Sequence, residues 1–181
     1  MKQHLKIIKK EEENNNLFYD SEILYKEDKD LLLKWLPSIP KKTRILINSK
    51  KDGDSTKMVT DKIEGKNPTL VIIKTKDGYK FGGYAAKKWV KETMINDNNA
   101  FVFSLDKKKK YNIVKPENSY YLTTWWGFGA NDNAIILTEN CTSRNGNFVN
   151  NKTYDIKEKY ELNGGKEYFT VESFEVFLIE Y

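Results

Sequence analysis

Apolar and polar positions alternate along the last stretch of the chain. In residues 168–180, YFTVESFEVFLIE, Val171, Glu175 and Phe177 fall on one side of a period-two pattern. A period of two is the spacing of side chains on one face of a β-strand. The pattern predicts a closing strand with one mostly apolar face and with Glu175 partly buried.

Further apolar runs predict that strands dominate the chain. Runs bounded by polar turns occupy residues 44–49, 69–75, 80–84, 100–105, 111–114, 120–124 and 134–138. Asp77-Gly78 separates the second and third runs and predicts a tight hairpin in which both residues have positive φ. The unbroken apolar residues 70–73 predict a strand buried on both faces. A short strand around Phe148 is expected within the polar segment 139–167.

Helical spacing of apolar residues appears at a few places. Residues 27–36 show it and end before Pro37, which disfavours helical geometry in the preceding residue. Ser21 is expected to cap a turn ahead of Ile23.

Other short segments carry weaker signals. Ser55 is a good N-cap for a helix over residues 56–64, and residues 51–54 are expected to form a turn. Residues 85–91 are expected to form a short helix that carries Trp89 inward.

About eight short strands with a few helices predict a β-dominated α+β domain. Two packed sheets bury many β-branched and aromatic residues, so we expect a two-sheet antiparallel β-sandwich with a few short helices. A length of 181 residues suits one domain. We assign residues 18–181 to it and residues 1–17 to a flexible tail, because KKEEENNN has nothing to bury. We expect a monomer.

Charge and composition narrow the function classes. The net charge is +5, but the lysines are spread among acids and only Arg44 and Arg144 are arginines. Nucleic-acid binders more often concentrate charge and use arginine forks, so a lysine-driven nucleic-acid binder is a minor alternative. No apolar run approaches the length of a membrane span, and the N-terminus lacks the apolar core of a signal peptide. A cytoplasmic protein without membrane insertion is therefore expected.

Catalytic side chains are sparse. The chain has one histidine, His4, and one cysteine, Cys141, far apart in sequence, whereas zinc sites and nucleophilic triads need clustered partners. We therefore predict no catalytic, cofactor or metal site. Two alternatives stay open: Cys141 as an exposed redox thiol rather than a small buried residue, and Glu175 as a general acid or base rather than a structural anchor.

An aromatic cluster is the candidate recognition element. Trp125-Trp126-Gly127-Phe128-Gly129 has glycines around its aromatics, but a predicted strand follows it where a phosphate loop needs a helix. It is either a tight corner with aromatics packed beneath or an exposed recognition loop.

Several segments, taken in order, resemble the TLDc domain family of the oxidation-resistance proteins. The similar segments are residues 21–37, Ile45 to Ser55 (ILINSKKDGDS), Pro68 to Trp89 (PTLVIIKTKDGYKFGGYAAKKW), Ala100 to Leu105, Phe128-Gly129 with Asp132, and Tyr168 to Phe177. Asp54 stands where the family usually has an aromatic residue.

The resemblance implies a sandwich fold without an established catalytic centre. It further implies a role in oxidative-stress resistance, with the peripheral stalk and catalytic sector of the vacuolar proton-pumping ATPase as partner. The protein would then act in the cytoplasm or at the cytosolic face of endolysosomal or vacuolar membranes. The residues expected to bind a partner are Trp125, Trp126, Phe128, Gly129 and Asp132.

Overall fold

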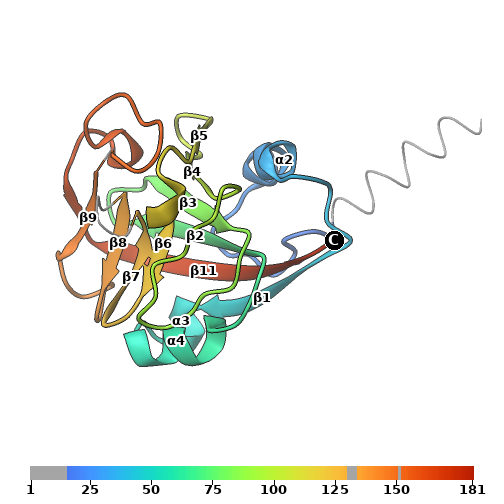
Figure 1. The fold of residues 1–181 in the computed structure, drawn as a ribbon, viewed down its shortest axis with the longest axis horizontal. Helices are drawn as coiled ribbons and strands as arrows, with labels where there is room; N and C mark the ends of the chain where they lie inside the picture. The colour runs from blue at the N-terminus through green and yellow to red at the C-terminus, as the bar shows by residue number, and fades with distance from the viewer. Residues whose placement is uncertain (1–15, 130–133, 151) are drawn as a thin grey trace, which may run out of the picture.

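Two antiparallel sheets form the body of the molecule in the computed structural model, which describes residues 16–129, 134–150 and 152–181 (Figure 1). The six-stranded sheet has the order β1-β11-β2-β3-β4-β5, and the five-stranded sheet has the order β10-β9-β8-β7-β6. All strand pairs are antiparallel, which confirms the predicted β-dominated sandwich.

Most element bounds lie within about two residues of the predicted runs, but the strand at residues 125–128 was not expected. The six-stranded sheet consists of β1 (Lys42–Asn48), β2 (Thr69–Thr75), β3 (Lys80–Ala85), β4 (Phe101–Ser104), β5 (Lys109–Asn112) and β11 (Val171–Glu180). The five-stranded sheet consists of β6 (Tyr120–Leu122), β7 (Trp125–Phe128), β8 (Ile135–Thr138), β9 (Asn147–Val149) and β10 (Tyr168–Phe169). The helices are α2 (Lys26–Trp35), α3 (Ser49–Asp52) and α4 (Thr56–Ile63), with 3-10 turns at Pro116–Asn118 and Glu161–Asn163.

The main core lies between the two sheets. Val71 and Ile73 of β2 point into it, while Leu70 and Ile72 point to the opposite side of the sheet. The prediction that β2 is buried on both faces is therefore confirmed. Trp89 is at the centre of the core: its indole nitrogen donates to Thr69 Oγ1 at 2.8 Å, and its ring packs against those of Tyr120, Trp126 and Phe128.

Close approach of the sheets depends on a glycine in β3. A Cβ atom on Gly83 would lie 2.5 Å from the ring of Phe128 in β7, a distance that the packing cannot accept without a shift. The missing side chain therefore lets an aromatic ring of one sheet rest on the backbone of the other.

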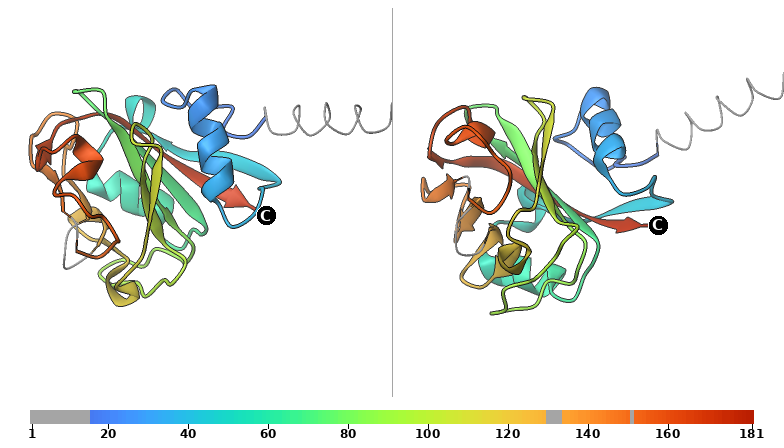
Figure 2. Two further views of the ribbon diagram at one scale, coloured as in Figure 1. Left: turned by 90° about the horizontal axis from the view of Figure 1, so that it is seen from above. Right: turned by 45° about the horizontal axis from the view of Figure 1, so that its top comes forward.

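A second apolar cluster covers the outer face of the six-stranded sheet. We call residues 17–36, which include α2, the N-terminal arm. Figure 2 shows α2 and the five-stranded sheet on opposite sides of the six-stranded sheet. The arm buries Leu17, Phe18, Ile23, Leu24, Leu32 and Leu36 against the sheet. Residues 1–15 of the predicted tail lie outside the described residues, and Leu17, which we had assigned to that tail, is buried.

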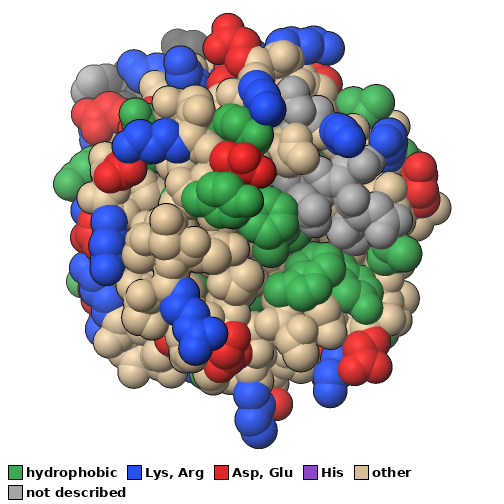
Figure 3. Space-filling view, turned by 90° about the vertical axis from the view of Figure 1, so that its left-hand side faces the viewer, with side chains coloured by type: hydrophobic (Ala, Val, Ile, Leu, Met, Phe, Trp, Pro, Cys, Tyr) green, Lys and Arg blue, Asp and Glu red, His purple; other side chains and the backbone are tan. Residues whose placement is uncertain are grey.

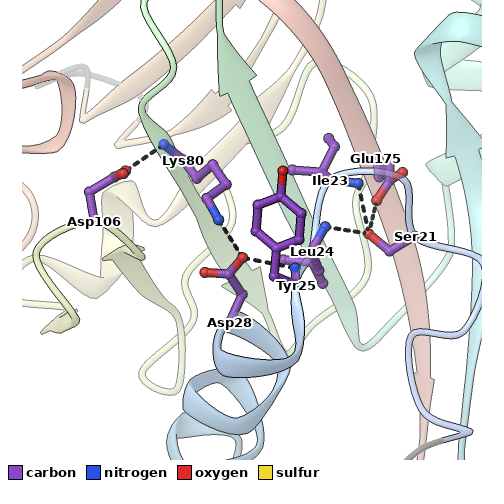
Figure 4. Close-up of polar contacts among 8 residues, drawn as sticks. All are labelled: Ser21, Ile23, Leu24, Tyr25, Asp28, Lys80, Asp106 and Glu175. Atoms are coloured by element: carbon purple, nitrogen blue, oxygen red, sulfur yellow. Dashed lines mark hydrogen bonds and ion pairs between the residues drawn. The ribbon is translucent and has the colours of Figure 1, made fainter.

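Polar contacts at two places, Glu175 and Lys80, fix the arm on the sheet (Figure 4). The Glu175 carboxylate in β11 accepts hydrogen bonds from Ser21 Oγ at 2.5 Å and from the Glu22 amide at 2.7 Å. Ser21 Oγ in turn accepts from the Leu24 amide at 3.0 Å, as its predicted capping role requires. At the start of α2, Asp28 forms an ion pair with Lys80 of β3.

Two local predictions are wrong. Residues 85–91 do not form a helix: the Asp97 carboxylate accepts from the amides of Ala86 and Lys87, and Trp89 forms a parallel bridge with Glu64. Trp89 still points inward as predicted. The expected turn at residues 51–54 instead begins within α3, whose start is capped by the Asn48 side chain accepting from the Lys50 amide.

The backbone also departs from prediction in the hairpin and in β11. Only Gly78 of the β2–β3 hairpin has positive φ, because Gly78 N–H closes a turn onto the Thr75 carbonyl and leaves Asp77 in an ordinary conformation. A bulge between Val171 and Ser173 shifts the phase of β11. As a result Val171 faces the main core, Glu175 faces the arm, and the strand is buried on both faces.

The buried ion pair between Lys80 and Asp28 yields a test. The two side chains are 14% and 10% exposed. Lys80→Met would leave the Asp28 carboxylate buried without its cation, and we expect a loss of about 3 kcal/mol in the free energy of unfolding. Lys74→Met is the matched control, because its ion pair with Glu172 is partly exposed and worth about 1 kcal/mol or less. Urea denaturation measures both, and equal losses would contradict the assigned role of the buried pair.

Candidate partner-binding site

A row of apolar side chains crosses the outer face of the five-stranded sheet. Strand register places Tyr121 opposite Gly127, Gly127 opposite Ile136, Ile136 opposite Phe148, and Phe148 opposite Tyr168. Residues in register on neighbouring strands share a face. We call these five residues together with Trp125 the aromatic row.

Alternation along each strand explains why these residues point outward. Tyr120, Leu122, Trp126, Phe128, Ile135, Leu137 and Val149 belong to the core between the sheets, and their neighbours in sequence must therefore face the other way. Ile136 is outside both core clusters although it is buried.

Aromatic pairs lie on both sides of Gly127 and Ile136. The rings of Tyr121 and Trp125 are 5.1 Å apart, and those of Phe148 and Tyr168 are 6.2 Å apart. Tyr168 is the most exposed member at 53%. Figure 3 views the molecule from this side and shows apolar side chains gathered near the middle of the face, with charged side chains around them.

Gly127 contributes no side chain to the row and is itself buried. Its φ is +147°, and a Cβ atom there would lie 1.9 Å from the Ile135 carbonyl oxygen. Any side chain at this position would therefore displace β8.

The structure separates the residues predicted to bind a partner. Trp125 lies half-buried in the aromatic row, whereas Trp126 and Phe128 are each 1% exposed and pack in the core. Gly129 is also buried, and Asp132 lies outside the described residues. The segment forms the strand β7 rather than a loop or corner, so its aromatics alternate between core and surface. Tyr121, Ile136, Phe148 and Tyr168 were not singled out from the sequence.

Cys141 lies in the core rather than at the surface. Burial raises the pKa of its thiol to about 12, and the nearby carboxylates of Asp54 and Glu139 add to the shift. A thiol acts as a nucleophile in its ionised form, so this placement disfavours the redox alternative. The loop that holds Cys141 is tied to the start of α4, since Asp54 accepts from the Thr142 amide at 2.9 Å and hydroxyl at 2.7 Å.

Glu175 has the contacts of a structural anchor. It is 1% exposed, and its carboxylate holds Ser21 and the Glu22 amide. Burial raises the pKa of Glu175 above its ordinary value of 4.5, while the hydrogen bonds from Ser21 and Glu22 partly offset the rise.

The arrangement of the charged side chains bears on the metal and nucleic-acid alternatives. Within residues 16–129, 134–150 and 152–181, no three His, Cys, Asp or Glu side chains are grouped closely enough to hold a metal ion. His4 lies outside these ranges. Lysines pair with carboxylates at several separate places, as in Lys57–Asp61, Lys62–Asp52 and Lys166–Asp77. Among the described helices, none is long and apolar enough to cross a membrane.

Comparison with known proteins gives a family match over nearly the whole chain. The family model described as the TLDc domain matches residues 17–180.

The chain is also similar to curated proteins named MTOR-associated protein MEAK7. Identity is 42% over 65 residues with the Gallus gallus protein, covering 35% of this chain and 14% of that protein. It is 31% over 90 residues with the Xenopus laevis protein, covering 49% of this chain and 20% of that protein. Identity with the Mus musculus protein is 27% over 92 residues, covering 50% of this chain and 20% of that protein. The matched part thus spans at most a fifth of these relatives.

Neighbouring tryptophans with opposite orientations yield a stability test. Trp126→Ala removes a fully buried ring that packs against Trp89 and Phe174, and we expect it to cost about 3–5 kcal/mol of unfolding free energy. Trp125→Ala should cost about 1 kcal/mol, because its ring is half-exposed beside Tyr121. Thermal and urea unfolding measure the difference. A larger loss for Trp125→Ala would show that the assigned strand phase is wrong.

The raised pKa of Glu175 yields a test of pH dependence. Since the folded state holds this proton more tightly than the unfolded state, the group favours folding most below pH 4.5, and its contribution is lost as the pH rises through the folded-state pKa. Glu175→Gln removes the titration. We expect the unfolding free energy of wild type minus that of the variant to fall as the pH rises from about 4 to 8, measured by urea denaturation. A difference that rises with pH would contradict the assignment.

Proposed function

Because this chain belongs to the TLDc domain family, we propose that it is a non-enzymatic protein-interaction module that regulates a larger assembly. The proposed partner is the vacuolar proton-pumping ATPase, contacted at its peripheral stalk or catalytic sector in connection with oxidative-stress resistance. The proposed place of action is the cytoplasm, at the cytosolic face of endolysosomal or vacuolar membranes. The aromatic row is the observation that carries the proposal.

The composition and shape of the aromatic row suit protein recognition. Tyrosine and tryptophan are enriched at interface hot spots because they bury much area at a low cost in side-chain entropy. Trp125 and Tyr168 belong to separate ring pairs on a rigid sheet, which limits the loss of freedom on binding. A central apolar strip with charged side chains around it is the usual anatomy of an interface.

The placement of the reactive candidates favours binding over catalysis. Cys141 is buried with a raised pKa, and Glu175 is occupied by two hydrogen bonds from the N-terminal arm. Neither position offers a nucleophile or proton donor to a substrate in a cleft.

The names of the similar proteins favour a second candidate partner. The relatives from Gallus gallus and Xenopus laevis are named as MTOR-associated. An MTOR-containing assembly is therefore the alternative partner for the same aromatic row.

Affinity capture followed by mass spectrometry tests the proposal. From cells that express the pump, the tagged chain should recover pump subunits at physiological salt. The double variant Trp125→Ala, Tyr168→Ala should lower this recovery about tenfold, because two aromatic anchors are lost. The double variant Val114→Ala, Met94→Ala is the control, since these exposed apolar residues are not in the aromatic row.

The outcome separates the candidates. Recovery of MTOR components in place of pump subunits, lost in the same aromatic variant, would favour the alternative partner. Equal recovery with the aromatic and control variants would show that the aromatic row is not the interface.

A further inference from the structure

Two Asn-Gly sequences occur in the chain, and they lie in opposite surroundings. Asn145-Gly146 is in the loop between β8 and β9, and Asn163-Gly164 is in the loop between β9 and β10. An asparagine side chain can be attacked by the backbone nitrogen of the next residue. Glycine at that next position favours the attack, because it has no Cβ atom to restrict the backbone or block the approach. Whether the attack occurs then depends on how the fold holds each pair.

The Asn145-Gly146 pair is exposed and unheld. Both residues are exposed to solvent in the loop that precedes β9. Among the hydrogen bonds of the described residues, none involves a group of Asn145 or Gly146. The backbone of this pair can therefore rotate, and bring nitrogen and side chain together, without breaking a hydrogen bond.

The rest of the same loop is fixed by one buried side chain. Asn147 accepts a hydrogen bond from the Thr138 amide at 2.9 Å. It donates to the carbonyl oxygens of Cys141 at 3.0 Å and Arg144 at 3.2 Å. Asn147 is 0% exposed. The loop is thus held on both sides of Asn145-Gly146, and this pair is left outside the network.

The Asn163-Gly164 pair is locked. Asn163 is 0% exposed and ends the 3-10 turn Glu161–Asn163. Its side-chain nitrogen donates to the carbonyl oxygens of Lys166 at 3.0 Å and Tyr168 at 3.1 Å. To react, the side chain would have to turn toward the next backbone nitrogen and give up both buried hydrogen bonds, which costs free energy.

We propose that Asn145 is a site of spontaneous deamidation, and that the fold protects Asn163 from the same reaction. The backbone nitrogen of Gly146 forms a bond with Cγ of Asn145, and the bond from Cγ to the side-chain nitrogen breaks. Ammonia leaves with the hydrogen that the backbone nitrogen gives up. Water then opens the cyclic succinimide to aspartate or isoaspartate and restores the backbone N–H. Water replaces ammonia, and no oxidant, reductant or second protein takes part.

The products change the loop in two ways. Either product turns a neutral side chain into a carboxylate, so the net charge of the chain falls from +5 to +4. Isoaspartate also adds a methylene group to the main chain between two held points, the Arg144 carbonyl and Asn147.

The new charge lies near one end of the aromatic row. Asn145 is three residues from Phe148, so their Cα atoms are at most about 11 Å apart. That distance is close to the Debye length of about 8–10 Å at ordinary ionic strength, so the charge is felt at β9. The deamidation itself does not depend on the proposed function of the row.

Peptide mass spectrometry tests the proposal on the full chain. The folded protein is incubated at mildly alkaline pH, which promotes loss of the backbone proton. The peptide that contains Asn145 should gain about 1 Da. The gain at Asn163 should be at least about 100-fold slower, since holding reacting groups away from their attack geometry costs about that factor. Cation-exchange chromatography should show more acidic forms of the protein accumulating at the rate measured for Asn145.

Two controls identify the cause. In guanidinium chloride the fold no longer protects Asn163, and both asparagines should react at similar rates. Asn145→Gln should abolish the acidic forms, because the longer side chain closes a ring far more slowly. Asn98→Gln is the matched variant and should leave them unchanged, since Asn98 is equally exposed but is followed by Asn99 instead of glycine.

Three results would each overturn the proposal. The first is a folded chain in which Asn145 stays intact. The second is equal reaction of Asn145 and Asn163 in the folded chain, because the fold would then protect neither. The third is undiminished formation of acidic forms by the Asn145→Gln variant.

Discussion

The contact between the Phe128 ring and the backbone of Gly83 sets the spacing of the two sheets. Because β3 has no side chain there, β7 can rest its ring on the opposing sheet, 2.5 Å from where a Cβ atom would lie. The same contact places Phe128 beside Trp89 and Tyr120 in the core. Once Phe128 and Trp126 point inward, Trp125 and Gly127 must point outward. The phase of β7, and with it the aromatic row, follows from this one close approach.

Periodicity and capping residues predict most of the fold because they act over a few neighbouring positions. The Ser55 side chain caps α4 by accepting from the Met58 amide at 3.2 Å, as its sequence context indicates. Two of the features that sequence patterns miss have distant causes. Residues 86–87 are held by Asp97 and the phase of β11 is reset by a bulge, and neither influence is visible in a local window.

The candidate site could be predicted only in part for the same physical reason. A cluster of aromatics at residues 125–128 is visible in the sequence, but strand phase decides that Trp125 is at the surface while Trp126 is in the core. Tyr121, Ile136, Phe148 and Tyr168 come from four other strands and meet only through register. The buried anchor role of Glu175 could be predicted from the sequence, because a lone carboxylate among apolar strand residues needs a hydrogen-bonding partner.

The N-terminal arm limits where this domain can be divided for recombinant work. Leu24, Leu32 and Leu36 of the arm lie over Leu70, Phe103 and other apolar residues of the six-stranded sheet. A fragment that starts after Pro37 would uncover that face and leave Glu175 without its two donors. Such a fragment would expose a large apolar surface to water and would aggregate, even if both of its sheets were formed. The minimal folding unit therefore has to include the arm.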